Sequence, residues 1–258
     1  MQDLQGKFAL VTGVANRRSI AYAIGERLAH YGARLAIAYQ PAEKSGVEDK
    51  IRKVTDEFGP ELVLPLDVTD PDSVNTLYRT LEETWGHLDI LVHSIATAMR
   101  DELSGRPSDI SLQGYLLAQQ VSAYSLIELM RGARPLMTQR GGSVITLTYI
   151  GSDRAVPNYN VMGSAKAALE ANVRYLAMEL GTENIRVNAI SAGPIRTVSA
   201  SGIKDFLGLL HNAAEKAPLN RNVTQEEVAH VAAFLASSLP SGITGQTLFV
   251  DAGYNVWG

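Results

Sequence analysis

The sequence alternates short apolar runs with longer segments of helical periodicity, and this alternation restricts the possible fold more than any other feature. Seven runs are rich in apolar residues, at 8–12, 34–39, 62–66, 89–93, 143–148, 185–190 and 247–250. Runs that are apolar at nearly every position are typical of parallel strands buried on both faces. Because the crossovers between such strands are right-handed, the pattern predicts an α/β fold with a doubly wound parallel sheet of about seven strands.

The composition excludes several classes of protein and of site. With no cysteine, the chain has no disulfide, thiolate nucleophile or Cys-ligated metal, and its five scattered histidines lack metal-site spacing, so we expect no metal. A formal net charge of -4 argues against nucleic-acid and anionic-membrane partners. No apolar run approaches the roughly 20 residues needed to cross a bilayer. We therefore expect one domain over residues 1–258 in the cytoplasm, or in the plastid stroma if a transit peptide preceded Met1.

The segment 12–21 links the first strand to its helix, at the sheet edge where ligands of open parallel sheets bind. Gly13 permits a sharp turn, and Ser19 offers a helix N-cap and a hydroxyl. The helix start presents free N–H groups and a positive dipole end to a pyrophosphate. The usual G-x-G-x-x-G is absent, so the loop alone is equally consistent with an ordinary strand-to-helix connection.

Polar side chains also follow the next three strands. Gln40 ends the second strand, where an acid would bind a ribose diol and an arginine a 2′-phosphate; the amide can still hydrogen-bond the diol or the adenine. Asp67-Val68 follows the third strand, where Asp67 either meets the adenine or caps the helix that begins near Pro71. His93-Ser94-Ile95-Ala96, at the end of the fourth, would approach the nicotinamide ribose. Together these four strand ends predict a Rossmann-type dinucleotide site.

The segment 149–166 carries the most informative chemistry. Tyr159 and Lys166 are seven residues apart, about two helical turns, so both side chains are expected on one helical face. A neighbouring lysine would lower the pKa of the phenol and help it to hydrogen-bond or protonate an oxyanion. The same lysine could hold the nicotinamide ribose. Without the strand context, a packing tyrosine and a solvated lysine would be the better explanation, because Tyr/Lys pairs are common.

The chain resembles the short-chain dehydrogenase/reductase superfamily nearly end to end. The resemblance rests on Thr12-Gly13, Asp67-Val68, 187–190 with 192–194, and 250–253. Two departures distinguish it from common members: two extra residues between Gly13 and Ser19-Ile20-Ala21, and Met162 at the usual tyrosine position. Together with 157–163, Tyr149 and 191–197, these departures make it similar to the NADH-dependent enoyl-[acyl-carrier-protein] reductases of type II fatty-acid synthesis.

This resemblance implies a set of residue roles. Tyr159 would contact the thioester carbonyl of a trans-2-enoyl substrate, Tyr149 would be a second active-site tyrosine, and Ala98 would lie beside the substrate. NADH would be held by residues from several strand ends: Gly13, Ser19, Ile20, Gln40, Asp67, Val68, Ile95, Lys166, Ile195, Arg196, Thr197, Val198 and Ser199. The resemblance also implies acyl-carrier-protein-bound substrates, a homotetramer and inhibition by triclosan-like compounds.

Residues 197–210 are rich in small side chains and end in Leu207, Leu209 and Leu210. The pattern predicts a mobile lid with an apolar inner face for an acyl chain, and an ordinary surface helix is the alternative.

Two other functions compete with enoyl reduction, namely reduction of 3-ketoacyl thioesters and redox-dependent partner binding without catalysis. Met162 cannot donate a proton, which counts against the first, and the presence of both Tyr159 and Lys166 counts against the second. The tyrosine lies three residues upstream of the usual position, about 4.5 Å along a helix. A tyrosine hydroxyl displaced by this distance suits an oxygen that lies further from the carbon that receives the hydride. In a conjugated enoyl thioester the hydride goes to the β-carbon and the charge to the carbonyl oxygen.

Overall fold

The computed structural model describes residues 4–42, 46–198 and 200–257. Seven parallel strands form one sheet in the order β3-β2-β1-β4-β5-β6-β7. Their bounds are β1 Phe8–Thr12, β2 Arg34–Tyr39, β3 Leu62–Pro65, β4 Ile90–His93, β5 Gly142–Thr148, β6 Ile185–Ala192 and β7 Thr247–Val250. All seven predicted strands are present, and each end lies within two residues of the prediction.

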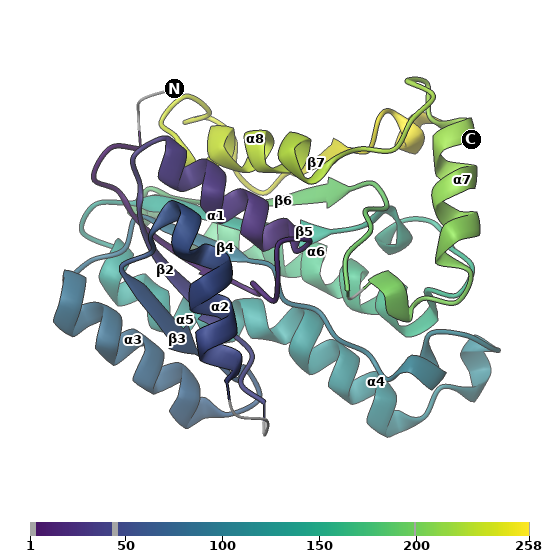
Figure 1. Cartoon of the computed structure of the whole chain (residues 1–258), viewed down its shortest axis with the longest axis horizontal. Coiled ribbons are helices and arrows are strands. Elements are labelled where there is room, and N and C mark those ends of the chain that lie inside the picture. The colour runs from purple at the N-terminus through teal and green to yellow at the C-terminus, as the bar shows by residue number, and fades with distance from the viewer. Residues whose placement is uncertain (1–3, 43–45, 199, 258) are drawn as a thin grey trace.

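Helices cover both faces of the sheet (Figure 1). They are α1 Ile20–His30, α2 Val47–Thr55, α3 Pro71–Trp85, α4 Leu112–Gln119, α5 Ser125–Met137, α6 Asn160–Leu180, α7 Phe206–Lys216 and α8 Gln225–Ala236, with a π-helical turn η4 (Gln120–Tyr124) joining α4 to α5. Helices α1, α2 and α8 contribute to one core cluster, and α3, α5 and α6 to the other. The predicted doubly wound arrangement is therefore confirmed.

The sheet is buried on both sides, as the uninterrupted apolar runs predicted. In β1, Phe8 and Leu10 pack into the core beside α3 and α5, whereas Ala9 and Val11 pack into the core beside α1 and α8. All five residues of this strand are buried. Alternate residues of a strand point to opposite faces, so a strand covered on both faces needs apolar side chains throughout.

The order of the strands determines where a ligand is expected to bind at the edge of the sheet. The chain winds outward from β1 to β3 and then returns to place β4 on the other side of β1, so the topological switch point lies between β1 and β4. Crevices at such points bind ligands in open α/β sheets. Pro65 lies in the edge strand β3, where a residue without an N–H is tolerated. Among the described residues, no helix is long and apolar enough to cross a membrane.

Candidate active site

At Gly13, directly after β1, the backbone closely approaches the segment that follows β4. Its φ of +88° lies in the left-handed region, and a Cβ built there would come 2.0 Å from the Ser94 carbonyl oxygen after β4. Its N–H donates to Ala38 O at 3.0 Å, which ties the turn to β2. Only glycine satisfies both the backbone angle and the close approach. The predicted sharp turn at Gly13 is confirmed.

Ser19 occupies the N-cap position of α1, as predicted, but its hydroxyl does not cap the helix. The Oγ atom instead accepts hydrogen bonds from Ala15 N and Asn16 N, both at 3.1 Å. The hydroxyl therefore folds the connecting loop back on itself instead of accepting from a first-turn N–H group of α1. Free N–H groups at a helix start favour an anion such as a pyrophosphate.

The ends of β2 and β3 meet through side chains. Asp67 accepts from Thr69 N at 2.8 Å and Thr69 Oγ1 at 2.7 Å. Hydrogen bonds from Thr69 and, more weakly, from Gln40 lower the pKa of Asp67 below its usual range. Asp70, rather than Asp67, caps α3 by accepting from Asp72 N, so the capping alternative for Asp67 is excluded. Asp67 is thus an ionised acceptor at the cleft.

A cleft of about 620 Å³ runs along these strand ends. Ten of the residues predicted to hold a cofactor line it: Gly13, Ser19, Ile20, Gln40, Asp67, Val68, Ile95, Lys166, Thr197 and Val198. Ile195 lies in an adjoining cavity, and Arg196 lines a different pocket behind the 194–196 segment. Ser199 lies outside the described residues. The tight turn at Gly13, the free helix start and the size of the cleft fit an extended dinucleotide.

Tyr159 and Lys166 line the same cleft, but only Lys166 lies within a helix. Helix α6 begins at Asn160, and Tyr159 is its N-cap residue with φ −122° and ψ 15°. The Tyr159 carbonyl accepts the first hydrogen bond, from Gly163 N at 2.8 Å. Tyr159 therefore lies at the N-cap, one residue before the first residue of α6, and the 4.5 Å displacement estimated from helix geometry is only approximate.

Burial shifts the pKa values of both Lys166 and Tyr159. Lys166 is 5% exposed, and burial lowers its pKa to about 8. Its Nζ donates to Leu147 O at 2.8 Å. Burial, with a smaller contribution from Tyr149, raises the pKa of Tyr159 above its usual range. The expectation that Lys166 lowers the pKa of the phenol is therefore wrong, and Tyr159 is a neutral hydrogen-bond donor at ordinary pH.

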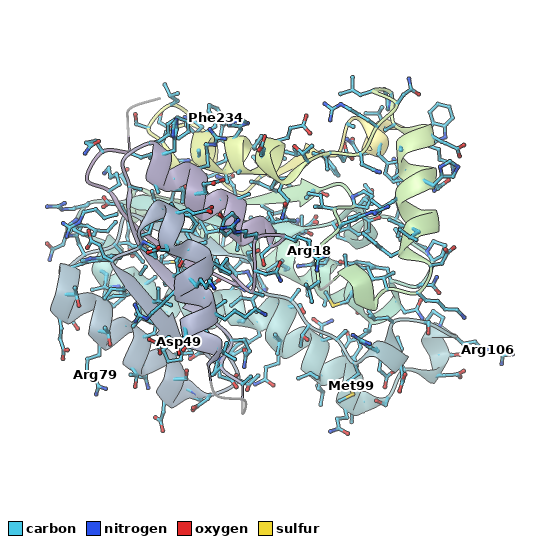
Figure 2. All side chains as sticks on the ribbon, in the orientation of Figure 1. Arg18, Asp49, Arg79, Met99, Arg106 and Phe234 are labelled. Atoms are coloured by element: carbon cyan, nitrogen blue, oxygen red, sulfur yellow. The ribbon has the colours of Figure 1, made fainter. Side chains whose placement is uncertain are left out.

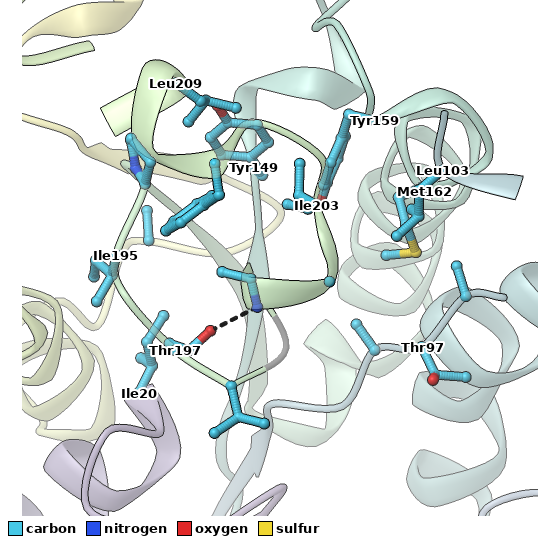
Figure 3. A pocket seen from close by; sticks show the side chains of 18 of the residues that line it. Ile20, Thr97, Leu103, Tyr149, Tyr159, Met162, Ile195, Thr197, Ile203 and Leu209 are labelled. Atoms are coloured by element: carbon cyan, nitrogen blue, oxygen red, sulfur yellow. Dashed lines mark hydrogen bonds between the residues drawn. The ribbon is translucent and has the colours of Figure 1, made fainter. Parts of the chain in front are cut away.

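A second cavity of about 340 Å³ opens beside the cleft and shares Tyr149 and Tyr159 with it. The two rings meet edge to face, with centroids 5.0 Å apart. The cavity lining is mostly apolar and includes Ala98, Leu103 and Met162 (Figure 3). Ala98, which the sequence predicts to lie beside the substrate, and Met162, at the position of the usual superfamily tyrosine, thus both lie in the cavity wall.

Part of the predicted lid segment lines this cavity, namely Thr197, Val198, Ala200, Gly202, Ile203, Phe206 and Leu209. The Thr197 hydroxyl accepts a hydrogen bond from Ala200 N at 3.0 Å (Figure 3). Leu209 lines the cavity, and Leu210 is buried. Leu207 is 64% exposed and points away from the cavity, so the expected apolar inner face excludes it.

Two buried polar residues support the site in a way that the sequence does not predict. Ser122, in η4, accepts from Thr97 N at 3.0 Å and donates to Thr97 O at 3.1 Å, which fixes a strand-end segment shared by both cavities. His93 lies between Thr146 Oγ1 and Ser125 Oγ, each 2.8 Å from a ring nitrogen, and burial lowers its pKa to about 3. The only sequence signal was a polar residue inside an otherwise apolar run.

The family comparison agrees with this geometry. A family model described as enoyl-(acyl carrier protein) reductase matches residues 13–255. The chain belongs to this enoyl-(acyl carrier protein) reductase family. The residues described here hold no group of three or more His, Cys, Asp or Glu side chains that could bind a metal ion.

Full-length relatives and solved structures fall in the same enoyl reductase family. A Synechocystis sp. protein named enoyl-[acyl-carrier-protein] reductase [NADH] FabI is 53% identical over 258 residues, covering 100% of both chains. The Bacillus cereus reductase crystallised with NADP+ and indole naphthyridinone has a TM-score of 0.95 at 48% identity, covering 100% of both chains. The Anaplasma phagocytophilum reductase in complex with NAD has a TM-score of 0.94 at 43% identity, covering 99% of this chain and 96% of that one.

Proposed function

We propose that this chain is an NADH-dependent enoyl-[acyl-carrier-protein] reductase that reduces the trans-2 double bond of enoyl thioesters. The observation that carries the proposal is the position of Tyr159 at the junction of the dinucleotide-shaped cleft and the apolar cavity. No described residue hydrogen-bonds its hydroxyl, so the phenol is available to a substrate oxygen. A thioester seated between the two cavities would place its acyl chain against the apolar walls.

Each active-site residue has a distinct task in this proposal. Tyr159 donates a hydrogen bond to the thioester oxygen, where negative charge collects as the enolate forms. Its raised pKa keeps the phenol protonated for that role. Lys166 holds the nicotinamide ribose, and Tyr149 orients Tyr159 through the edge-to-face contact. When bound, NADH supplies a hydride to the β-carbon of the substrate, and protonation at the α-carbon completes the reduction.

The strand ends support NADH rather than NADPH. Gln40 ends β2 where a 2′-phosphate would need a cation. Arg17, on the neighbouring loop, forms an ion pair with Glu57, which draws it away from the cleft. Arg18 remains near the start of α1 (Figure 2). We therefore propose a preference for NADH, and a higher kcat/KM with NADPH than with NADH would overturn it.

Two separate apolar surfaces support self-association into a homotetramer. Tyr175 and Met178 of α6 are 70% and 75% exposed, respectively. Phe249 of β7 and Trp257 near the C-terminus are 43% and 55% exposed. Two different self-complementary patches on one chain build a tetramer with three twofold axes. Sedimentation of the wild type, with Met178→Glu and Phe249→Glu variants that each stop at a dimer, would support this assembly; monomeric wild type would exclude it.

The cavity and the family also suggest the partners and the compartment. We propose that acyl-carrier-protein-bound enoyl thioesters are the substrates and that triclosan-like inhibitors bind against Tyr159 in the same apolar cavity. We propose the cytoplasm, or the plastid stroma, as the compartment.

The activity is tested by following NADH absorbance with a carrier-bound crotonyl thioester, for wild type and Tyr159→Phe. We expect turnover by the wild type and a rate lowered about 10²–10³-fold in the variant, which is the usual cost of losing one oxyanion donor. Equal rates for the two proteins would exclude Tyr159 as the donor to the enolate.

A further inference from the structure

Two asparagines flank Tyr159, and each reaches a different wall of the apolar cavity. The Asn158 side-chain Nδ2 donates to Lys204 O at 3.0 Å, in the 197–210 segment. The Asn160 Nδ2 donates to Gly105 O at 3.2 Å, in the loop that carries Leu103. One three-residue stretch of chain therefore contacts both sides of the cavity and holds the active-site phenol between them.

The two anchored segments are the ones that line the cavity. Ile203 precedes Lys204, and Leu103 lies two residues before Gly105; both side chains line the cavity. Both also pack in one apolar cluster with Tyr159. Figure 3 shows Ile203 and Leu103 on either side of the Tyr159 ring. The two amide hydrogen bonds thus close a ring of contacts around the tyrosine.

The backbone at Asn158 is specialised for this contact. Its φ is 61°, in the left-handed region that asparagine tolerates better than most residues. The next residue, Tyr159, then leads directly into the first turn of α6. Asn158 therefore both makes the turn and supplies the amide that bonds to Lys204 O.

We propose that Asn158 and Asn160 are positioning residues that clasp the two walls of the acyl cavity against Tyr159 and so set the affinity for the distal part of the acyl chain. The inference rests on the proposed function, because it assigns the cavity to an acyl chain. A four-carbon crotonyl group ends near the phenol, whereas a twelve-carbon chain must run between the two walls. Loosening either wall therefore weakens binding of the long chain more than that of the short one.

Amide hydrogen exchange tests the two hydrogen bonds of Asn158 and Asn160, which we call the clasp, without a measurement of activity. The Ile203 amide donates to Ala200 O at 3.0 Å, and the Leu103 amide donates to Arg100 O at 3.2 Å, so each reports on one wall. Asn158→Gly keeps the backbone angle and removes the amide, and we expect faster exchange at Ile203 with little change at Leu103. Asn160→Ala should give the reverse. If the Ile203 amide exchanges at the wild-type rate in Asn158→Gly, the proposed clasp is refuted.

Kinetics with two chain lengths test its effect on binding. In Asn158→Gly, and in Asn158→Asp, which keeps the shape but replaces the donor by a carboxylate, the KM ratio of dodecenoyl to crotonyl thioester should rise about three- to tenfold. Asn172→Ala is the matched control, since its Nδ2 donates to Ala123 O at 3.1 Å from the same helix α6, away from the cavity, and it should keep the wild-type ratio.

The possible results distinguish the proposed role of Asn158 and Asn160 from the proposed enoyl reductase function. Faster exchange at Ile203 with an unchanged KM ratio would overturn the role in acyl-chain binding. A wild type that reduces neither thioester would refute the proposed function, and the exchange data would still decide whether the clasp exists. A merely structural role would lower stability in the Asn158 variants without a dependence on chain length.

Discussion

Gly13→Ala is the sharpest perturbation of the cofactor cleft, because one methyl group meets two separate obstacles. The alanine would have to keep a φ of +88°, which costs about 1–2 kcal/mol for a residue with a Cβ. Its Cβ would also lie 2.0 Å from the Ser94 carbonyl oxygen, a backbone atom that cannot rotate away. Overpacking of this kind costs about 1–3 kcal/mol. We expect the free energy of unfolding to fall by about 2–5 kcal/mol.

Gly46→Ala isolates the backbone contribution. Gly46 has a φ of +87°, and a Cβ there would meet nothing within 4 Å. Urea unfolding should therefore show a loss of only about 1–2 kcal/mol in this control. Because the methyl at Gly13 separates the ends of β1 and β4, NADH fluorescence titration should also show at least about tenfold weaker binding for Gly13→Ala alone, equivalent to about 1.4 kcal/mol. Equal destabilisation of the two variants with unchanged NADH affinity would refute this reasoning.

Three other perturbations test the site. Lys166→Ala should weaken NADH binding in fluorescence titration as well as turnover, whereas Tyr159→Phe should mainly lower turnover; equal weakening of NADH binding by both would refute the division of roles. The buried His93 has its pKa lowered to about 3, so it stays neutral in the fold while the unfolded chain takes up a proton below about pH 6.5. Stability should therefore fall with pH below that value, by about 2 kcal/mol at pH 5, and urea unfolding of His93→Asn should show a flatter curve. Hydrogen exchange in 197–210 should slow when NADH and a substrate analogue bind, and strong protection already present without ligands would contradict the proposed lid.

The strands could be predicted because burial on both faces is a local property of the sequence. Every residue of β1 is apolar or small, and the same holds for most of β5 and β6. Because the carboxyl ends of parallel strands meet at one edge of the sheet, the sequence also predicts that Gly13, Gln40 and Asp67 lie close together, and all three line the same cleft. Their partners were not predictable in the same way. Ser19 bonds its own loop, and Asp67 bonds Thr69 instead of capping α3.

The features that sequence reasoning missed depend on contacts between distant segments. Ser122 holds Thr97 across 25 residues, and nothing in either local sequence indicates that they meet. The spacing of Tyr159 and Lys166 predicts a shared helical face but does not locate the start of α6, because the N-cap residue makes no side-chain hydrogen bond. The pKa of Tyr159 was assigned the wrong direction because its burial outweighs any effect of Lys166, and burial is known only from the fold.

The most direct test of the account compares two thioesters that differ in the bond to be reduced. In the proposed function Tyr159, which lines both cavities, donates to the thioester oxygen, while Met162 has no proton to donate to a carbonyl at the hydride-accepting carbon. NADH oxidation should therefore be measured in parallel with carrier-bound crotonyl and acetoacetyl thioesters. The account predicts rapid oxidation with crotonyl thioester and negligible oxidation with acetoacetyl thioester. Comparable kcat/KM values for the two substrates would contradict it.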